Sequence, residues 1–401
     1  MTVESVATSS STNPAPDLVI LLGAGASLAV GMPSVADVTA RVMSGEHVVR
    51  HTDGNYYFGD PNPNIPDGFT PRALVMVRYM ASKMALFYFH DDMYQVTYED
   101  IYYGLDQIEQ SLSWEYENPL LSPFINALRV DMGPLYPGRE RESRPRWRLT
   151  ELVEEARRYV RDVIWHLLQP TPDDLSGLQV IGDACQHFAG AGLDIFTLNH
   201  DTTLEEHLRG RDMKLVDGFG DAVNGIRYRD IGRFESGKGK LRLFKLHGSV
   251  NWFTFTGSAA LGIPESWDIW HTMDPAGRRQ WPASGRPEFL CGTFNKILDY
   301  QSPIYSDLHY QFSQSLDAAT LLLVVGYGFR DKAINSRLHR WMREGERRMV
   351  VVHPDQQSLI TSARPLMQRC MFEWRRDGRL VFVDKHAQDC SWSETGAALG
   401  L

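Results

Sequence analysis

The chain has 401 residues, of which 43% are hydrophobic and 11% aromatic, so it can bury a folded core and extensive disorder is excluded. Its formal net charge of −9 argues against direct binding to nucleic acid or to anionic membranes. The four cysteines lie far apart and form no C-x-x-C pair, which argues against a thiolate zinc site and a disulfide framework, so no metal is expected.

The first segment of the chain, residues 1–16, is rich in Ser, Thr and Pro and is predicted to be a flexible tail. It lacks the basic start and the apolar segment of a secretion signal. No apolar run in the sequence reaches the roughly 20 residues that a membrane-spanning helix needs. Together with scattered single cysteines, which suit a reducing compartment, these features lead us to expect a cytoplasmic protein without membrane association.

An apolar strand that begins at Asp17 runs directly into a glycine-rich loop, Gly23-Ala24-Gly25-Ala26-Ser27. Such a strand, loop and helix start presents backbone N–H groups to a phosphate. Gly23 and Gly25 permit the tight turn and close approach that a larger side chain would block. The dinucleotide fingerprint has a third glycine where this chain has Leu28. The loop therefore indicates a nucleotide site that is not of the dehydrogenase type, and an ordinary strand–helix turn is the structural alternative.

Residues 51–178 show a helical pattern of apolar residues rather than short apolar strands. Helical spacing of apolar residues extends over 71–130, and 149–169 is predicted to be a strongly amphipathic helix. We interpret 51–178 as a helical module inserted into an α/β domain that comprises 17–50 and 179–401.

Four further short apolar strands are expected, and each is followed by polar residues. They are 193–198 before Asn199-His-Asp201, 241–246 before His247-Gly-Ser249, 321–325 before Gly326-Tyr-Gly-Phe329, and 348–352 before His353-Pro-Asp355. This pattern predicts an α/β fold with a Rossmann-like parallel sheet covered by helices on both faces. Ligands bind at the carboxyl ends of such strands, so the polar residues are expected to meet there. Residues 255–290 are interpreted as an irregular loop near the mouth of the site.

Five motifs occur in the order seen in sirtuin-like proteins. They are GAGAS at 23–27 with Gly31-Met-Pro33, T-x-N-x-D at 197–201, LHGS at 246–249, Gly292-Thr293, and GYGFRD at 326–331. The chain most resembles the sirtuin-like NAD-hydrolysing effectors of bacterial anti-phage defence, over roughly 17–50 and 180–360. It departs from sirtuin deacetylases because the zinc-binding cysteine pairs and their small lobe are missing. The resemblance therefore favours hydrolysis of NAD over protein deacylation.

The resemblance also implies roles for three residues in cleaving NAD, which would be the substrate. Asn199 would hold the attacking water or a ribose hydroxyl, and Asp201 would line the nicotinamide pocket. His247 would be the general base, a role that suits an imidazole titrating near neutrality. The structural alternatives are a strand-end histidine for His247 and caps of the following helix for Asn199 and Asp201.

The remaining expected contacts are made to the rest of the dinucleotide. Backbone N–H groups of Gly23, Ala24, Gly25, Ala26 and Ser27 would cradle the pyrophosphate. Thr293 and Asn295 lie where the family has its second phosphate- and ribose-contacting loop, and Gly326 and Gly328 would give the adenosine half room to approach the backbone. Asp355 is a candidate for bonding an adenosine ribose hydroxyl, with a surface loop carboxylate as the equal alternative.

We therefore expect an NAD glycohydrolase (NAD nucleosidase) that yields nicotinamide and ADP-ribose and acts as an abortive-infection effector. The alternatives are a non-catalytic NAD- or ADP-ribose-binding regulatory module of a defence complex, and a protein deacylase or ADP-ribosyltransferase. Unrestrained NAD hydrolysis would kill the host, so control by homo-oligomerisation or by a partner is expected. By resemblance, such a partner is a HerA-type helicase or ATPase, an Argonaute protein or a phage-derived trigger.

Overall fold

The computed structural model describes residues 18–60, 67–87, 95–115, 118–135, 145–256, 260–265, 281–292 and 303–401. Seven strands form one sheet in the order β13-β12-β11-β1-β4-β8-β5, and all neighbouring pairs are parallel. The strands are β1 (Leu18–Leu22), β4 (Leu193–Thr197), β5 (Leu215–Val216), β8 (Leu241–Lys245), β11 (Leu321–Val325), β12 (Arg348–Val352) and β13 (Leu380–Val383). The expected α/β fold with a Rossmann-like parallel sheet is confirmed.

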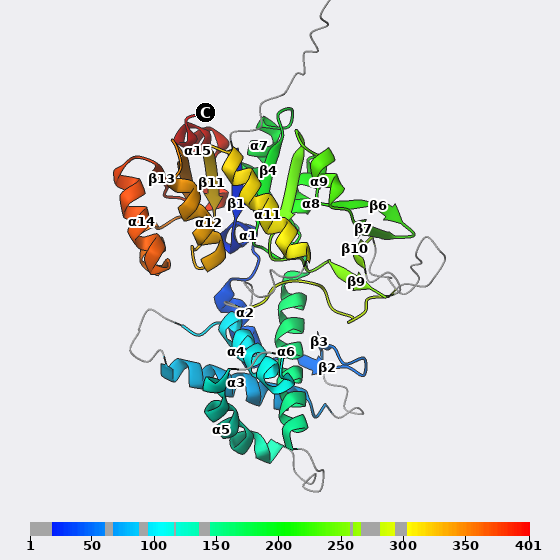
Figure 1. Cartoon of the computed structure of the whole chain (residues 1–401). Helices are drawn as coiled ribbons and strands as arrows, with labels where there is room; N and C mark the ends of the chain where they lie inside the picture. Colours follow the sequence, from blue (N-terminus) through cyan, green and yellow to red (C-terminus); the bar gives the residue numbers. More distant parts are fainter. Residues whose placement is uncertain are drawn as a thin grey trace, which may run out of the picture.

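Both faces of the sheet are covered by helices because its strands are apolar on both sides (Figure 1). Successive side chains of a strand point to opposite faces. Val19 and Leu21 of β1 pack into one hydrophobic cluster, whereas Leu18, Ile20 and Leu22 pack into another. The first cluster includes residues of α9 (Gly232–Ser236), α11 (Pro303–Ala318), α12 (Lys332–Met342), α13 (Gln356–Ser362) and α14 (Pro365–Arg376). The second includes residues of α7 (Gln179–His187), α8 (Thr203–Gly210), η3 (Ser176–Leu178), η5 (Ala387–Asp389) and α15 (Trp392–Leu399).

The sheet changes its direction of growth at β1, which lies at its centre. From β1 the chain builds outward through β4 and β8 on one side, and through β11, β12 and β13 on the other. At such a switch point the two neighbouring loops diverge, so a crevice opens at the carboxyl ends of the strands. The short helix α1 (Ala24–Leu28) begins directly after β1 at this crevice.

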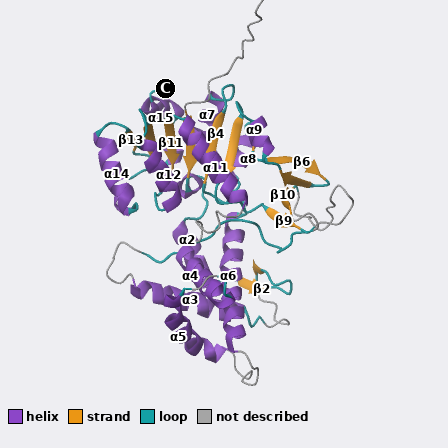
Figure 2. Ribbon diagram, in the orientation of Figure 1, coloured by secondary structure: helices purple, strands orange, loops and turns teal. Residues whose placement is uncertain are grey.

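A helical body lies below the sheet in Figures 1 and 2 and surrounds the long helix α6 (Pro145–Leu168). Its other elements are α2 (Val35–Ser44), β2 (Val48–Arg50), β3 (Tyr56–Phe58), α3 (Thr70–Phe87), α4 (Tyr98–Ser113), η1 (Pro119–Leu121), α5 (Ser122–Met132) and η2 (Gly133–Leu135). Val153, Val160 and Ile164 of α6 are fully buried in its core. Val38 and Val42 of α2 pack in the same core, so part of the segment 17–50 joins the helical body rather than the sheet.

A second, antiparallel sheet lies beside the main sheet and has the order β6-β7-β10-β9. Its strands are β6 (Phe219–Val223), β7 (Ile226–Arg229), β9 (Phe253–Phe255) and β10 (Ala260–Pro264). The interpretation of 255–290 as wholly irregular is therefore wrong at β10, which pairs with both β7 and β9. The turn between β6 and β7 is Asn224-Gly225, with φ of 53° and 82°. Asn-Gly with two positive φ angles is the usual two-residue hairpin turn.

Two properties of the described residues bear on function classes. None of their helices combines the length and the apolar character needed to cross a membrane. They also contain no group of three or more His, Cys, Asp or Glu side chains arranged to hold a metal ion.

Candidate functional site

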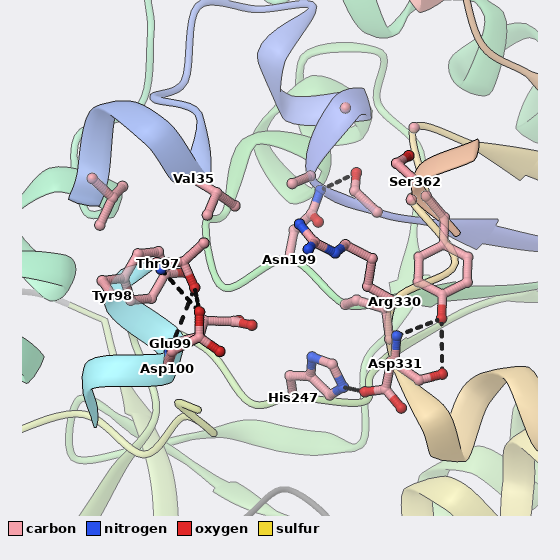
Figure 3. Close-up of a pocket in the computed structure, with 18 of the residues that line it drawn as sticks. Val35, Thr97, Tyr98, Glu99, Asp100, Asn199, His247, Arg330, Asp331 and Ser362 are labelled. Carbon is pink, nitrogen blue, oxygen red and sulfur yellow. Dashed lines mark hydrogen bonds and ion pairs between the residues drawn. The ribbon is translucent and has the colours of Figure 1, made fainter. Parts of the chain in front are cut away.

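A cavity of about 1650 Å³ lies at the carboxyl ends of the central strands and extends to the helical body. This exceeds the roughly 300–1,000 Å³ of an ordinary small-molecule pocket. From the sheet side it is lined by Gly23, Gly25, Asn199, His247, Gly326 and Asp331, among others. From the helical side it is lined by residues of α2, α3 and α4, including Val35, Thr97, Glu99 and Asp100. Figure 3 shows Thr97, Glu99 and Asp100 across the cavity from Asn199, Arg330 and His247.

The glycine-rich loop after β1 packs against the loop after β11. The Gly25 N–H donates to the Gly326 carbonyl at 2.9 Å, and the Gly23 N–H donates to the Val325 carbonyl at 3.0 Å. A Cβ at Gly25 would lie 2.7 Å from the Gly326 Cα, which is closer than real Cβ atoms come. These glycines are therefore required for the contact between the two backbones.

This packing changes the role expected for the loop. The Ala26 N–H donates to the Gly23 carbonyl at 2.9 Å, so the amides of Gly23, Gly25 and Ala26 all donate to backbone carbonyls. A pyrophosphate cradle made of all five amides, from Gly23 to Ser27, is therefore contradicted at these three positions. Gly23 and Gly25 do permit a close approach of another group, as predicted, but that group is the backbone of the loop after β11.

Asn199 follows β4 and connects its loop to the glycine-rich loop. Its Nδ2 donates to the Gly23 carbonyl at 2.9 Å and to the Ser27 Oγ at 2.8 Å. Its backbone N–H donates to the Thr197 Oγ1 at 3.1 Å. Both side-chain bonds use the amide nitrogen, so Oδ1 is the atom that can accept a hydrogen bond from a water or a hydroxyl in the cavity. The helix-cap alternative does not describe Asn199 here.

The side chain of Asp201, two residues further on, bonds to the start of the following helix, whose N-cap is Thr202. Its Oδ1 accepts the backbone N–H of Thr203, the first residue of α8, at 3.1 Å. Its carbonyl oxygen accepts a hydrogen bond from the Lys245 Nζ, which also lies 2.8 Å from the Glu205 Oε1. Asp201 lines the cavity but is only 6% exposed. Its carboxylate thus has the structural role named as the alternative, and its expected contact with nicotinamide stays a prediction.

His247 directly follows Leu246, after β8, and its ring is held by a carboxylate from another loop. Its Nε2 lies 3.2 Å from the Asp331 Oδ2, and His247 is 3% exposed (Figure 3). Asp331 is fixed in turn because its Oδ1 accepts the backbone N–H groups of Ala333 and Ile334 at 2.8 and 3.1 Å, at the start of α12. A carboxylate bound to one ring nitrogen orients the imidazole and stabilises its protonated form.

A second buried imidazole, His309 of α11, contributes to this environment and is 2% exposed. Burial, together with the nearby charges of Arg337 and His247 and against an opposing effect of Asp331, lowers the pKa of His309 to about 3. His309 is therefore neutral at neutral pH.

The residues expected to hold the adenosine half are only partly brought together. Gly326 and Gly328 line the cavity. Among the described residues Asp355 lies outside the cavity lining, and its Oδ1 accepts the Ser358 N–H at 2.9 Å as the cap of α13. The expectation of a ribose contact by Asp355 is thus not supported, and its helix cap explains it. Thr293 and Asn295 lie outside the described residues.

The cavity also carries charged side chains that the sequence analysis did not single out as site residues. Arg330 and Arg364 line it from the sheet side, and the Arg364 Nε donates to the Arg330 carbonyl. Glu99 and Asp100 line it from α4, and Lys83 lines it from α3, with its Nζ 4.8 Å from the centre of the Tyr79 ring. Arg330 and Asp331 belong to the GYGFRD motif, which is recognisable in the sequence, but the motif did not indicate the roles of these two side chains. Nothing in the sequence of 95–115 indicates that it faces the sheet.

The chain was compared with protein families, curated proteins and solved structures. The family model described as SIR2-like domain matches residues 194–370. No curated protein gives a match. The chain is similar to a mutant Sir2 homologue in complex with ADP-ribose, at 12% identity and a TM-score of 0.38, with 95% of this chain and 91% of that chain covered.

Two further solved structures give similar values. A Sir2 homologue–NAD complex has 13% identity and a TM-score of 0.35, with 95% of this chain and 88% of that chain covered. Sir2Tm bound to a propionylated peptide has 10% identity and a TM-score of 0.35, with 96% and 95% covered. These values are too low to transfer a ligand or an activity. The family match, by contrast, spans β4, β8, β11 and β12 together with Asn199, His247 and Asp331. Residues 194–370 of the chain thus match the SIR2-like domain.

Proposed function

We propose that this protein is an NAD glycohydrolase, in which water replaces nicotinamide at the ribose C1′ to give ADP-ribose, free nicotinamide and a proton. The observation that carries the proposal is that Asn199 and His247, from different strands, line one cavity together with the glycine-rich loop. An amide and an imidazole at one site suit the positioning of a water and the removal of its proton.

The chemistry proposed for these residues follows from their contacts. The Asn199 Oδ1 accepts a hydrogen bond from the attacking water or from a ribose hydroxyl, while its Nδ2 stays bound to the glycine-rich loop. His247 takes the proton that the water loses, and Asp331, at 3.2 Å, stabilises the imidazolium. Arg330 and Arg364 are the cations that line the sheet side, and we assign them to the pyrophosphate.

Incubation of the purified protein with NAD, followed by chromatography of the products, tests the proposal. Nicotinamide and ADP-ribose should appear in equal amounts. His247→Ala and Asn199→Ala should each lower the rate at least about 100-fold, the usual contribution of a general base or a positioned water. Glu46→Gln, an exposed substitution on the helical body, should change nothing. Recovery of intact NAD from the wild type, with and without a candidate trigger, would contradict the proposal.

We further propose that this activity drains cellular NAD as an abortive-infection effector of anti-phage defence. Its support is the resemblance in motif order, together with the need to restrain a toxic hydrolase. Restraint is assigned to a homo-oligomer or to a partner such as a HerA-type ATPase, an Argonaute protein or a phage-derived trigger. Expression of the wild type during infection should lower cellular NAD, and His247→Ala should leave it unchanged. Transfer of label from NAD to protein would instead indicate an ADP-ribosyltransferase.

A further inference from the structure

The first turn of α4 forms the wall of the cavity opposite the sheet. The Asp100 Oδ2 accepts hydrogen bonds from the Thr97 N–H at 2.9 Å and from the Thr97 Oγ1 at 2.7 Å. The Asp100 N–H donates to the Thr97 Oγ1 at 3.4 Å, so the two residues form a capping box. Asp100 is 8% exposed, so its carboxylate is used to fix the start of the helix. Glu99 lies between these two residues in the sequence and lines the cavity from a turn that the capping box holds in place (Figure 3).

α4 cannot easily move away from the site because it is anchored in the helical core. Ile101 and Leu105 are fully buried, and Asp106 pairs with Arg157 of α6 at 2.7 Å. The wall that carries Glu99 is therefore as rigid as the core beneath it.

A short segment connects the backbone of Glu99 to that of His247. The Leu290 N–H donates to the His247 carbonyl at 2.8 Å. Two residues later, a Cβ built on Gly292 would lie 3.6 Å from the Glu99 carbonyl oxygen. Residues 290–292 thus run from the backbone of His247 to the backbone of Glu99.

The cavity carries side chains of both charges, as the substrate does. NAD has an anionic pyrophosphate and a positively charged nicotinamide ring. Arg330 and Arg364 line the sheet side, where His247 also lies, and Glu99 lines the facing wall (Figure 3). A carboxylate attracts a nearby cation strongly in a cavity from which water is partly excluded. In this orientation the glycosidic bond lies among Glu99, Asn199 and His247.

We propose that Glu99 is a further catalytic residue, whose carboxylate faces the nicotinamide–ribose half of the substrate and stabilises its positive charge during cleavage. This inference rests on the proposed function. As the C–N bond breaks, its electron pair leaves with nicotinamide, which becomes neutral, and the positive charge passes to the ribose ring. Water then adds at C1′ and loses its proton to His247. Ionised carboxylates serve this purpose for ribosyl-type cations in glycoside hydrolysis.

The test compares binding of two ligands that differ in charge at this position. Carbocyclic NAD keeps the cationic ring but cannot be hydrolysed through a ribosyl cation, and ADP-ribose lacks the ring. Glu99→Gln should weaken binding of carbocyclic NAD about tenfold, measured by calorimetry, and should change binding of ADP-ribose less than about twofold. Glu99→Asp should keep the preference for carbocyclic NAD. Glu151→Gln, on the exposed face of α6, is the matched control and should bind both ligands like the wild type.

A kinetic arm separates the inference from the proposed function. Where the wild type releases nicotinamide, Glu99→Gln should lower kcat about 100-fold or more, since the missing charge acts mainly in the transition state. If the wild type binds carbocyclic NAD in a Glu99-dependent way but releases no nicotinamide from NAD, the proposed hydrolase function is wrong. The contact between Glu99 and the cationic ring is then still supported. Equal loss of both ligands in Glu99→Gln, binding of neither ligand by the wild type, or an unchanged kcat in Glu99→Gln would overturn the inference.

Discussion

The His247 Nε2 lies 3.2 Å from the Asp331 Oδ2, although the two residues follow different strands, β8 and β11. Asp331 divides its two oxygens between tasks, because Oδ1 caps α12 while Oδ2 meets the imidazole. The position of the ring is thus tied to the start of a helix on the opposite side of β1.

Asp331→Asn tests this relationship without removing the helix cap. Asn keeps an Oδ1 that can accept the N–H groups of Ala333 and Ile334, but it loses the charge beside His247. We expect kcat for NAD to fall about 10- to 100-fold, with unchanged affinity for ADP-ribose and a melting temperature near that of the wild type. Asp174→Asn is the matched control, since the Asp174 Oδ1 accepts the Ser176 N–H at 2.8 Å at an exposed helix start. An equal fall in both variants would contradict a role through His247.

A pH dependence of stability follows from the buried His309. Its folded-state pKa is lowered to about 3, below the 6.5 of a free histidine, so the unfolded chain binds a proton first as the pH falls. Stability from this group is complete above about pH 6.5 and is lost toward pH 3. Between pH 7.5 and pH 5.0 the loss is about 2 kcal/mol.

The measurement is urea unfolding of the wild type and of His309→Gln at both pH values. The free energy of unfolding of the wild type should differ between the two pH values, and the substitution should remove the part of this difference that His309 causes. Burial also lowers the pKa of His166 and of His207, and these residues act in the same direction, so a smaller dependence should remain in the variant. Identical pH dependence in the two proteins would show that His309 titrates normally in the folded state.

The buried pair of Asp162 and Arg286 is expected to be important for stability. Asp162 has a fully buried side chain, and its Oδ1 lies 2.6 Å from the Arg286 Nε. Its Oδ2 accepts the Tyr56 N–H at 2.9 Å. Removal of one partner leaves an uncompensated buried charge, so Asp162→Asn should lower the free energy of unfolding by about 3–5 kcal/mol.

Chemical unfolding of single and double variants checks this. Asp162→Asn combined with Arg286→Gln should recover part of the loss, because neither charge then remains unpaired. A change below about 1 kcal/mol for Asp162→Asn alone would mean that water or another group replaces the lost contact.

The contact between the two central loops can be tested at Gly326. It has a φ of +67°, and a Cβ there would lie 2.2 Å from the Ala26 backbone nitrogen. An alanine in the left-handed conformation costs about 1–2 kcal/mol. Gly326→Ala should lower the free energy of unfolding by more than this, because of the clash, and should weaken binding of ADP-ribose. Gly345→Ala is the control, because Gly345 has a φ of +61° and nothing within 4 Å of its would-be Cβ. Thermal unfolding and calorimetry distinguish the clash from backbone strain alone.

The strands that were predictable share a simple signature. β1, β4, β8, β11 and β12 are each five residues long and apolar over much of their length, and polar or glycine residues follow at the crevice. β5 has two residues and β6 is largely exposed, so neither carries such a run. Asn224-Gly225 was a readable hairpin signal between β6 and β7, whereas the pairing of β10 depends on distant partners.

The candidate site was predictable where motifs follow strands. Asn199 and His247 line one cavity, as their positions after parallel strands indicated, while their chemical roles remain predictions. The pairing of Asp331 with His247 depends on how two loops meet, which no local pattern records. Glu99 is harder still to predict from the sequence, because its place at the site depends on how the helical body packs against the sheet.

The segment 281–292 joins α6 to the loop of His247. Arg286 is held by Asp162 of α6, the Arg161 Nη2 donates to the Pro287 carbonyl at 2.6 Å, and Leu290 is bonded to the His247 carbonyl. A change in the tilt of α6 would therefore be transmitted through this segment to the backbone of His247. A partner that binds the outside of the helical body and displaces α6 would therefore shift the backbone of His247 without entering the cavity.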